Sequence, residues 1–96
     1  MASWQQFEEH VRILASAKWN TPASPETING VKCDCVLKPR KDYWVVIEIT
    51  EENSLDKSRT DLGKFHTIKP FLFSKNIFAE CYFIVKDLVA GSSLRN

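Results

Sequence analysis

The amino-acid sequence has few residues that interrupt helices and strands, few cysteines and no long apolar segment. Its 96 residues include only three cysteines, three glycines and four prolines, which argues against a disordered or low-complexity chain. No apolar run approaches the roughly 20 residues that a membrane helix needs. Glu8, Glu9 and Arg12 interrupt the segment where a secretory signal would be apolar. An odd number of cysteines without such a signal favours free thiols in a reducing, cytoplasmic compartment.

Neither sign of charge is in clear excess. Thirteen lysines and arginines face 12 aspartates and glutamates, so the formal net charge is +1. This excludes a strongly basic packaging protein and an acidic tail protein, but a basic surface can still coexist with an acidic metal site. The length and the 44% hydrophobic content are typical of one domain. We assign it to residues 1–88, with residues 89–96 as a C-terminal tail or linker.

The first half of the chain alternates between helical and extended patterns. Apolar residues recur every three or four positions over residues 3–19, which predicts a helix. Residues 21–27 are polar and contain two prolines, so they are expected to form a loop. Residues 28–38 are expected to form a strand or a bent pair of strands around a turn at Gly30.

The second half supplies the rest of a sheet. Residues 43–50 are nearly all β-branched or aromatic and predict a central strand, paired as a hairpin with the strand before it. A helix should begin near Ser54 and be kinked or ended by Pro70, and residues 77–85 predict a further strand. A helix between two strands favours a parallel crossover. The predicted class is therefore α/β, with a mixed central sheet flanked by helices in the order helix-strand-strand-strand-helix-strand.

Two acidic residues stand inside apolar strand sequences. Asp34 lies between two cysteines, and Glu48 lies between two isoleucines. An ionised carboxylate in such a place is costly unless it is paired, hydrogen-bonded or bound to metal. Because these two residues belong to adjacent predicted strands, their carboxylates can meet at one point of the sheet. Two carboxylates there favour a hard cation with oxygen ligands, Mg²⁺ or Mn²⁺.

These residues and the order of elements resemble the PD-(D/E)xK nuclease superfamily, which has the restriction-endonuclease-like fold. Cys33-Asp34 matches the first acidic motif, with cysteine in place of proline. Glu48-Ile49-Thr50 matches the second motif, with threonine where lysine is usual. The resemblance covers roughly residues 4–85 and implies metal-dependent hydrolysis of phosphodiester bonds.

The resemblance also implies a set of metal ligands. Asp34 and Glu48 would bind the Mg²⁺ or Mn²⁺ ion, and the backbone carbonyl of Ile49 would complete the shell. A glutamate on the first helix often joins this site in the superfamily. Glu8 matches that pattern more closely than Glu9.

The missing lysine of the second motif has two candidate replacements on the predicted second helix. Thr50 stands at the motif position and carries no charge. Some members of the superfamily take the lysine from the following helix, where Lys57 and Lys64 are available. Together with Asp61 these lysines are spaced i, i+4, i+7, so they line one stripe of the helix.

The expected function is a nuclease that hydrolyses phosphodiester bonds, with DNA favoured over RNA as the substrate. At this size the chain is expected to dimerise or to be the nuclease module of a longer protein. Phosphate contacts would make its binding dependent on salt. The basic residues predicted to make those contacts are Lys38, Arg40, Lys41, Arg59 and Lys69.

Three alternatives stay open on the sequence alone. The same fold could bind nucleic acid or a protein partner without cleaving anything, because the motif lysine is absent. Asp34 and Glu48 could be structural carboxylates in an interaction domain. Cys33, Cys35 and Cys81 with a histidine suggest zinc, because C-x-C spacing on a strand would put two sulfurs on one face; buried free thiols are the simpler interpretation.

Overall fold

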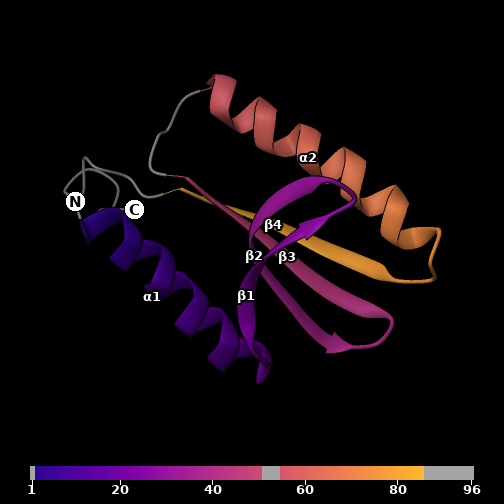
Figure 1. The fold of residues 1–96 in the computed structure, drawn as a ribbon, viewed down its shortest axis with the longest axis horizontal. Helices are drawn as coiled ribbons and strands as arrows, with labels where there is room; N and C mark the ends of the chain where they lie inside the picture. The colour runs from indigo at the N-terminus through magenta and orange to yellow at the C-terminus, as the bar shows by residue number, and fades with distance from the viewer. Residues whose placement is uncertain (1, 51–54, 86–96) are drawn as a thin grey trace, which may run out of the picture.

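The computed structural model of the chain describes residues 2–50 and 55–85. The predicted tail at residues 89–96 lies outside these ranges. Within them the chain forms helices and strands in the predicted order (Figure 1). The elements are α1 (Ala2–Trp19), β1 (Ala23–Ile28), β2 (Val31–Arg40), β3 (Tyr43–Thr50), α2 (Leu55–Phe73) and β4 (Phe78–Val85).

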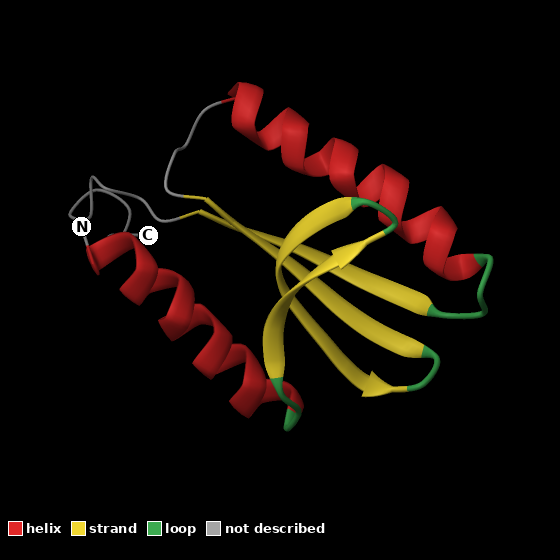
Figure 2. Cartoon of the chain, in the orientation of Figure 1, coloured by secondary structure: helices red, strands yellow, loops and turns green. Residues whose placement is uncertain are grey.

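One mixed sheet with strand order β1-β2-β3-β4 forms the centre of the molecule. β1 and β2 pair antiparallel, as do β2 and β3, whereas β3 and β4 are parallel. α2 lies between β3 and β4 in sequence, so the predicted parallel crossover is confirmed. α1 and α2 lie on opposite sides of the sheet (Figure 2). In the part of the chain described, no helix is long and apolar enough to cross a membrane.

Alternate residues of β3 face the two helices, because successive side chains of a strand point to opposite sides. Val45, Ile47 and Ile49 face α1 and pack with its residues Val11 and Ala15. Val46 faces α2, and Glu48 shares its side. A strand buried on both faces explains why residues 43–50 are apolar almost throughout.

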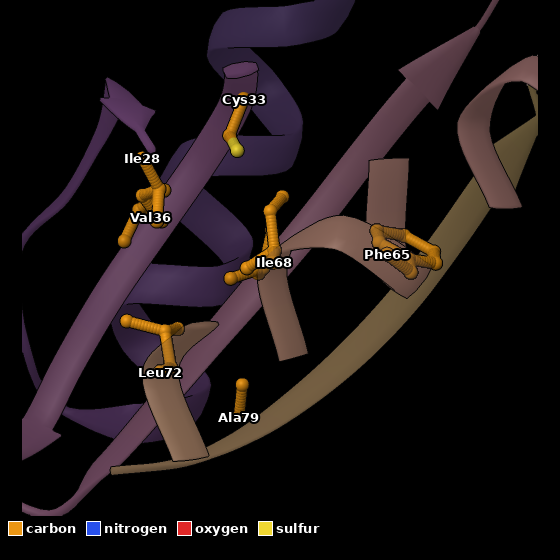
Figure 3. Packing of buried hydrophobic residues seen from close by; sticks show 8 residues of the cluster. Ile28, Cys33, Val36, Phe65, Ile68, Leu72 and Ala79 are labelled. Carbon is orange, nitrogen blue, oxygen red and sulfur yellow. The ribbon is translucent and has the colours of Figure 1, made fainter. Parts of the chain in front are cut away.

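The core beneath α2 lies along the C-terminal half of that helix. Ile68 and Leu72 point toward Val36 of β2 and Ala79 of β4 (Figure 3). All four side chains are buried. This cluster, and the one beneath α1, supply the apolar burial that stabilises the fold.

The loop predicted for residues 21–27 is wrong, because β1 spans residues 23–28. β1 is an edge strand in the sheet, so its outer backbone needs no partner, and it tolerates polar residues and Pro25. Its register with β2 shifts next to that proline. The predicted turn at Gly30 is confirmed, with Asn29 and Gly30 both at positive φ (50° and 79°), the geometry of a tight hairpin turn.

Pro70 does not end the second helix, because α2 continues to Phe73. A proline in a helix loses one backbone hydrogen bond and costs about 3 kcal/mol. Pro70 is exposed, whereas Ile68 and Leu72 on either side of it are buried against the sheet. Tertiary packing of Ile68 and Leu72 therefore outweighs the local cost of the proline.

Candidate functional site

Asp34 and Glu48 contact each other where the backbone pairing of β2 and β3 stops. The register between the strands runs as far as Cys35 opposite Ile47, and its next step brings Asp34 opposite Glu48. Beyond that pair, hydrogen bonds to side chains replace those between the two backbones. Glu48 Oε2 accepts a hydrogen bond from the Asp34 backbone N–H at 3.1 Å, and Asp34 Oδ2 accepts one from the Ile49 backbone N–H at 2.9 Å.

A β-bulge in β2 sets up this arrangement. Between two paired positions, β1 advances by two residues, Ser24 to Glu26, while β2 advances by three, Cys33 to Val36. The extra residue in β2 lies at Asp34 or Cys35. Bulges bend a strand and re-aim its side chains, often beside functional sites. Here the bulge coincides with the carboxylate that reaches across to β3.

Lys64 of α2 reaches Glu48 from above the sheet. Its Nζ lies 2.9 Å from Glu48 Oε1. Glu48 is fully buried, whereas the side chain of Lys64 is 26% exposed. Glu48 therefore lies beneath Lys64 and the half-buried Asp34, which are the members of the cluster that solvent reaches.

Asp61 is a third carboxylate at this point and, like Glu48, it is buried. Its side chain is 1% exposed, and its Oδ1 lies 3.6 Å from Lys64 Nζ. Asp61 and Lys64 are three residues apart on α2, a spacing that places side chains on one face of a helix. The ammonium of Lys64 consequently lies between the carboxylates of Glu48 and Asp61.

Burial and charge shift the pKa values of the pair in the same direction. Burial raises the pKa of the Glu48 carboxyl above its ordinary value, although the hydrogen bond from Lys64 opposes that rise. Burial alone would lower the pKa of Lys64, but its hydrogen bond to Glu48 and the nearby carboxylate charges raise it overall. Lys64 therefore carries a full positive charge at neutral pH.

Arg12 of α1 approaches the same point from the other side of the sheet. Its Nη1 donates a hydrogen bond of 3.3 Å to the backbone carbonyl of Asp34. It also lies 3.8 Å from Glu8 Oε1 and 3.3 Å from Glu9 Oε1. The carboxylate of the predicted ligand Glu8 is thus paired with Arg12.

The remaining predicted catalytic residues have different positions. Thr50 is buried at the C-terminal end of β3, two residues beyond Glu48 and on the same side. Ile49 takes part through its backbone N–H, while its side chain belongs to the core beneath α1. The side chain of Lys57 lies outside the part of the structure described. Of the two candidate lysines, Lys64 is the one seen at the carboxylates.

The predicted phosphate-binding residues are not gathered around this site. Lys38 and Arg40 lie at the C-terminal end of β2, and Lys41 lies in the β2–β3 turn. Arg40 is six residues, or roughly 20 Å, along β2 from Asp34. Lys38 pairs with Glu26 at 3.0 Å, and Arg40 lies 3.7 Å from an oxygen of Asp42. Arg59 and Lys69 are exposed on α2, each five residues from Lys64, so the three do not share one helix face.

The cysteines do not form a zinc site. Cys33 belongs to the core beneath α2 and Cys35 to the core beneath α1, so their sulfurs lie on opposite faces of the sheet. The expectation that C-x-C spacing places both on one face is wrong because of the bulge in β2. All three thiols are free. Burial raises the pKa of Cys33 to about 12 and that of Cys35 and Cys81 to about 11, so they are unreactive near neutral pH.

Two residues of the site were not assigned a role from the sequence. Arg12 lies four residues after Glu8 and three after Glu9, a spacing that indicates helix-surface ion pairs but not the contact with Asp34. Asp61 lies in the same helical stripe as Lys64. The signal that could have indicated its role is a charged residue next to apolar helix positions. Its burial could be known only once α2 was placed on the sheet.

The donor atoms of this site suit a hard divalent cation. Mg²⁺ is commonly held by one or two carboxylates together with waters and substrate phosphate oxygens, and Asp34 and Glu48 provide such a pair. Among the described residues no group of three or more histidine, cysteine or acidic side chains is arranged to hold a metal. No protein-family model, curated protein or solved structure matches the chain. The geometry of its own residues is therefore the basis for inferring function.

Proposed function

We propose that the protein is a metal-dependent nuclease of the restriction-endonuclease-like type, which hydrolyses phosphodiester bonds in DNA. One observation carries the proposal: hydrogen bonds join three elements at Glu48, which accepts from Lys64 Nζ and from the Asp34 backbone N–H. The carboxylate of Asp34 in turn accepts from the N–H of Ile49, the residue after Glu48. The order of helices and strands agrees with that fold. In this proposal Lys64, from α2 and not from β3, takes the role of the superfamily's lysine.

In this proposal the two carboxylates hold the cation and fix its position. A divalent cation bound there would polarise the phosphate and lower the pKa of water. The hydrogen bond from Ile49 N–H to Asp34 and that from Asp34 N–H to Glu48 orient both side chains. Backbone donors do not rearrange easily, so the carboxylates are oriented before a ligand arrives, which reduces the cost of binding.

Lys64 supplies the positive charge that Thr50 cannot. Its side chain is partly exposed, so its ammonium can approach a phosphate from the solvent side while Glu48 remains beneath it. A fixed positive charge stabilises the negative charge that develops on a phosphate oxygen during hydrolysis. Catalysis requires Glu48 in its ionised form, and the proximity of Lys64 favours that form.

The decisive test is cleavage of supercoiled plasmid DNA with Mg²⁺ and with EDTA. The wild-type chain should cut with Mg²⁺ and not with EDTA. Glu48→Gln keeps the size and a hydrogen-bonding oxygen but removes the charge, so cleavage should fall by at least about 10²-fold. Glu80→Gln is the matched control, because Glu80 lies on β4 and bonds the hydroxyl of Tyr43; it should cut like the wild type.

A nucleic-acid-binding domain without cleavage is the second candidate. The observation in its favour is that Lys64 is already paired with Glu48 at 2.9 Å, so one carboxylate has an internal counter-ion. This candidate predicts no cleavage with Mg²⁺ or Mn²⁺ but DNA binding that weakens steeply with salt. Equal cleavage by Glu48→Gln and wild type would contradict the nuclease proposal outright.

A further inference from the structure

The position of Lys64 has a consequence for cation binding. Its ammonium lies 2.9 Å from Glu48 Oε1, the carboxylate that, in the proposed function, holds the divalent cation. An ammonium and a divalent cation that need the same buried oxygen repel each other and compete for it. Glu48 can therefore bind the divalent cation only if the ammonium of Lys64 moves away.

Asp61 gives the displaced lysine a second partner. Its Oδ1 is 3.6 Å from Lys64 Nζ, so a small movement of the flexible side chain converts this contact into a hydrogen-bonded ion pair. Asp61 is itself buried, and a buried carboxylate is strongly stabilised by an adjacent ammonium. Lys64 thus has two carboxylates within reach, on β3 and on its own helix.

We infer that Lys64 is the counter-ion of Glu48 until a divalent cation binds. The cation then displaces the ammonium from Glu48, and Lys64 moves to Asp61, which acts as a positioning residue. The inference rests on the proposed function, because it takes Asp34 and Glu48 as the cation ligands. It adds that Lys64 lowers the cation affinity of the resting protein, and that Asp61 retains the lysine at the site for use against a phosphate.

Calorimetric titration with Ca²⁺ and Mn²⁺ in the absence of nucleic acid tests the exchange without reference to cleavage. Lys64→Met removes the competing ammonium and should bind the cation at least about fivefold more tightly than the wild type. In the wild type Lys64 occupies Glu48 for most of the time, and the apparent affinity is reduced by the fraction of molecules in which the site is free. Lys75→Met is the control for the loss of one positive charge. Lys75 follows α2 and lies over the ring of Phe71, 5.1 Å from its centroid, and its removal should change affinity less than twofold.

The role of Asp61 is tested by a double-mutant cycle. Asp61→Asn removes the second partner, so Lys64 stays on Glu48, and cation affinity should fall several-fold. In the Lys64→Met background the same change should alter affinity less than twofold. A mere loss of negative charge would weaken binding equally in both backgrounds, which would overturn the positioning role.

The outcomes separate this inference from the proposed function. If the wild type binds cation and cleaves DNA, but Lys64→Met binds no more tightly than Lys75→Met, the exchange is wrong and the nuclease proposal stands. If neither the wild type nor Lys64→Met binds a divalent cation, both are wrong. If Lys64→Met folds only when Ca²⁺ is added, as followed by circular dichroism, the cation has replaced the lysine as the counter-ion of Glu48, which supports the exchange.

Discussion

The two halves of α2 contact the same face of the sheet through opposite chemistry. The C-terminal half places Ile68 and Leu72 in an apolar cluster with residues of β2 and β4. The N-terminal half places Lys64 against Glu48 of β3 and Asp61 of the same helix. One half is held by burial of apolar area, and the other by a few short charged contacts.

The apolar half of α2 contributes mainly to stability, whereas the charged half offers groups that can take part in chemistry. Burial of apolar side chains contributes about 1.5–3 kcal/mol for each large residue. A buried ion pair often contributes no more than apolar residues of the same volume would, because desolvation offsets the attraction. A sheet that required only stability could have extended the apolar cluster to Glu48. The charged half is therefore the place to look for function.

The largest effect on stability should come from the apolar half. Leu72→Ala removes a fully buried side chain and should lower the free energy of unfolding by about 2–5 kcal/mol, because the cavity closes only in part. Chemical denaturation measures this directly. Cleavage per folded molecule should remain at the wild-type level. A loss of cleavage in the folded fraction would mean that the two halves are not separable.

A smaller stability effect, which depends on pH, is expected in the charged half. Lys64→Met leaves the buried carboxylate of Glu48 without its counter-ion and should cost about 1–3 kcal/mol near neutral pH. Burial already raises the pKa of Glu48 above its ordinary 4.5. The folded state of the variant will thus take up a proton at Glu48 more readily than the unfolded state does, and protonation removes the unfavourable buried charge.

The difference in stability between Lys64→Met and the wild type should therefore shrink as pH falls through the raised pKa of Glu48. On the alkaline side the wild type should lose the stabilisation from Lys64 only as pH rises above the ordinary lysine value, because the pKa of Lys64 is raised in the folded state. Denaturation curves at several pH values measure the change in stability on both the acidic and the alkaline side. A difference that is independent of pH would show that the pair does not carry the effect.

Periodicity predicted most of the fold because most of its elements bury alternate or three- to four-spaced apolar residues. Residues 43–50 were predicted with the bounds that β3 has. β1 was missed because an edge strand can be polar and contain proline, which removes the alternation. The continuity of α2 through Pro70 was missed because packing of Leu72 on the sheet has no local signal.

The candidate site was predictable only where a charge interrupts an apolar strand. Asp34 and Glu48 had that signal, and the structure joins Asp34 to Glu48 by one hydrogen bond and to the neighbouring Ile49 by another. The bulge in β2 had no such signal, so the separation of Cys33 from Cys35 could not be foreseen. The choice of Lys64 and the burial of Asp61 depend on how α2 lies on the sheet, which is a property of the tertiary structure.

Paramagnetic broadening by Mn²⁺ in the amide NMR spectrum tests the central claim most directly, because it reports where on the chain the cation binds. The backbone N–H groups of Asp34 and Ile49 donate to the two carboxylates proposed as ligands, so their signals should broaden first as Mn²⁺ is added. The amides of Leu72 and Ala79, in the apolar cluster, should stay sharp at the same concentration. No broadening, or broadening spread evenly over both halves of α2, would contradict a metal site at Asp34 and Glu48.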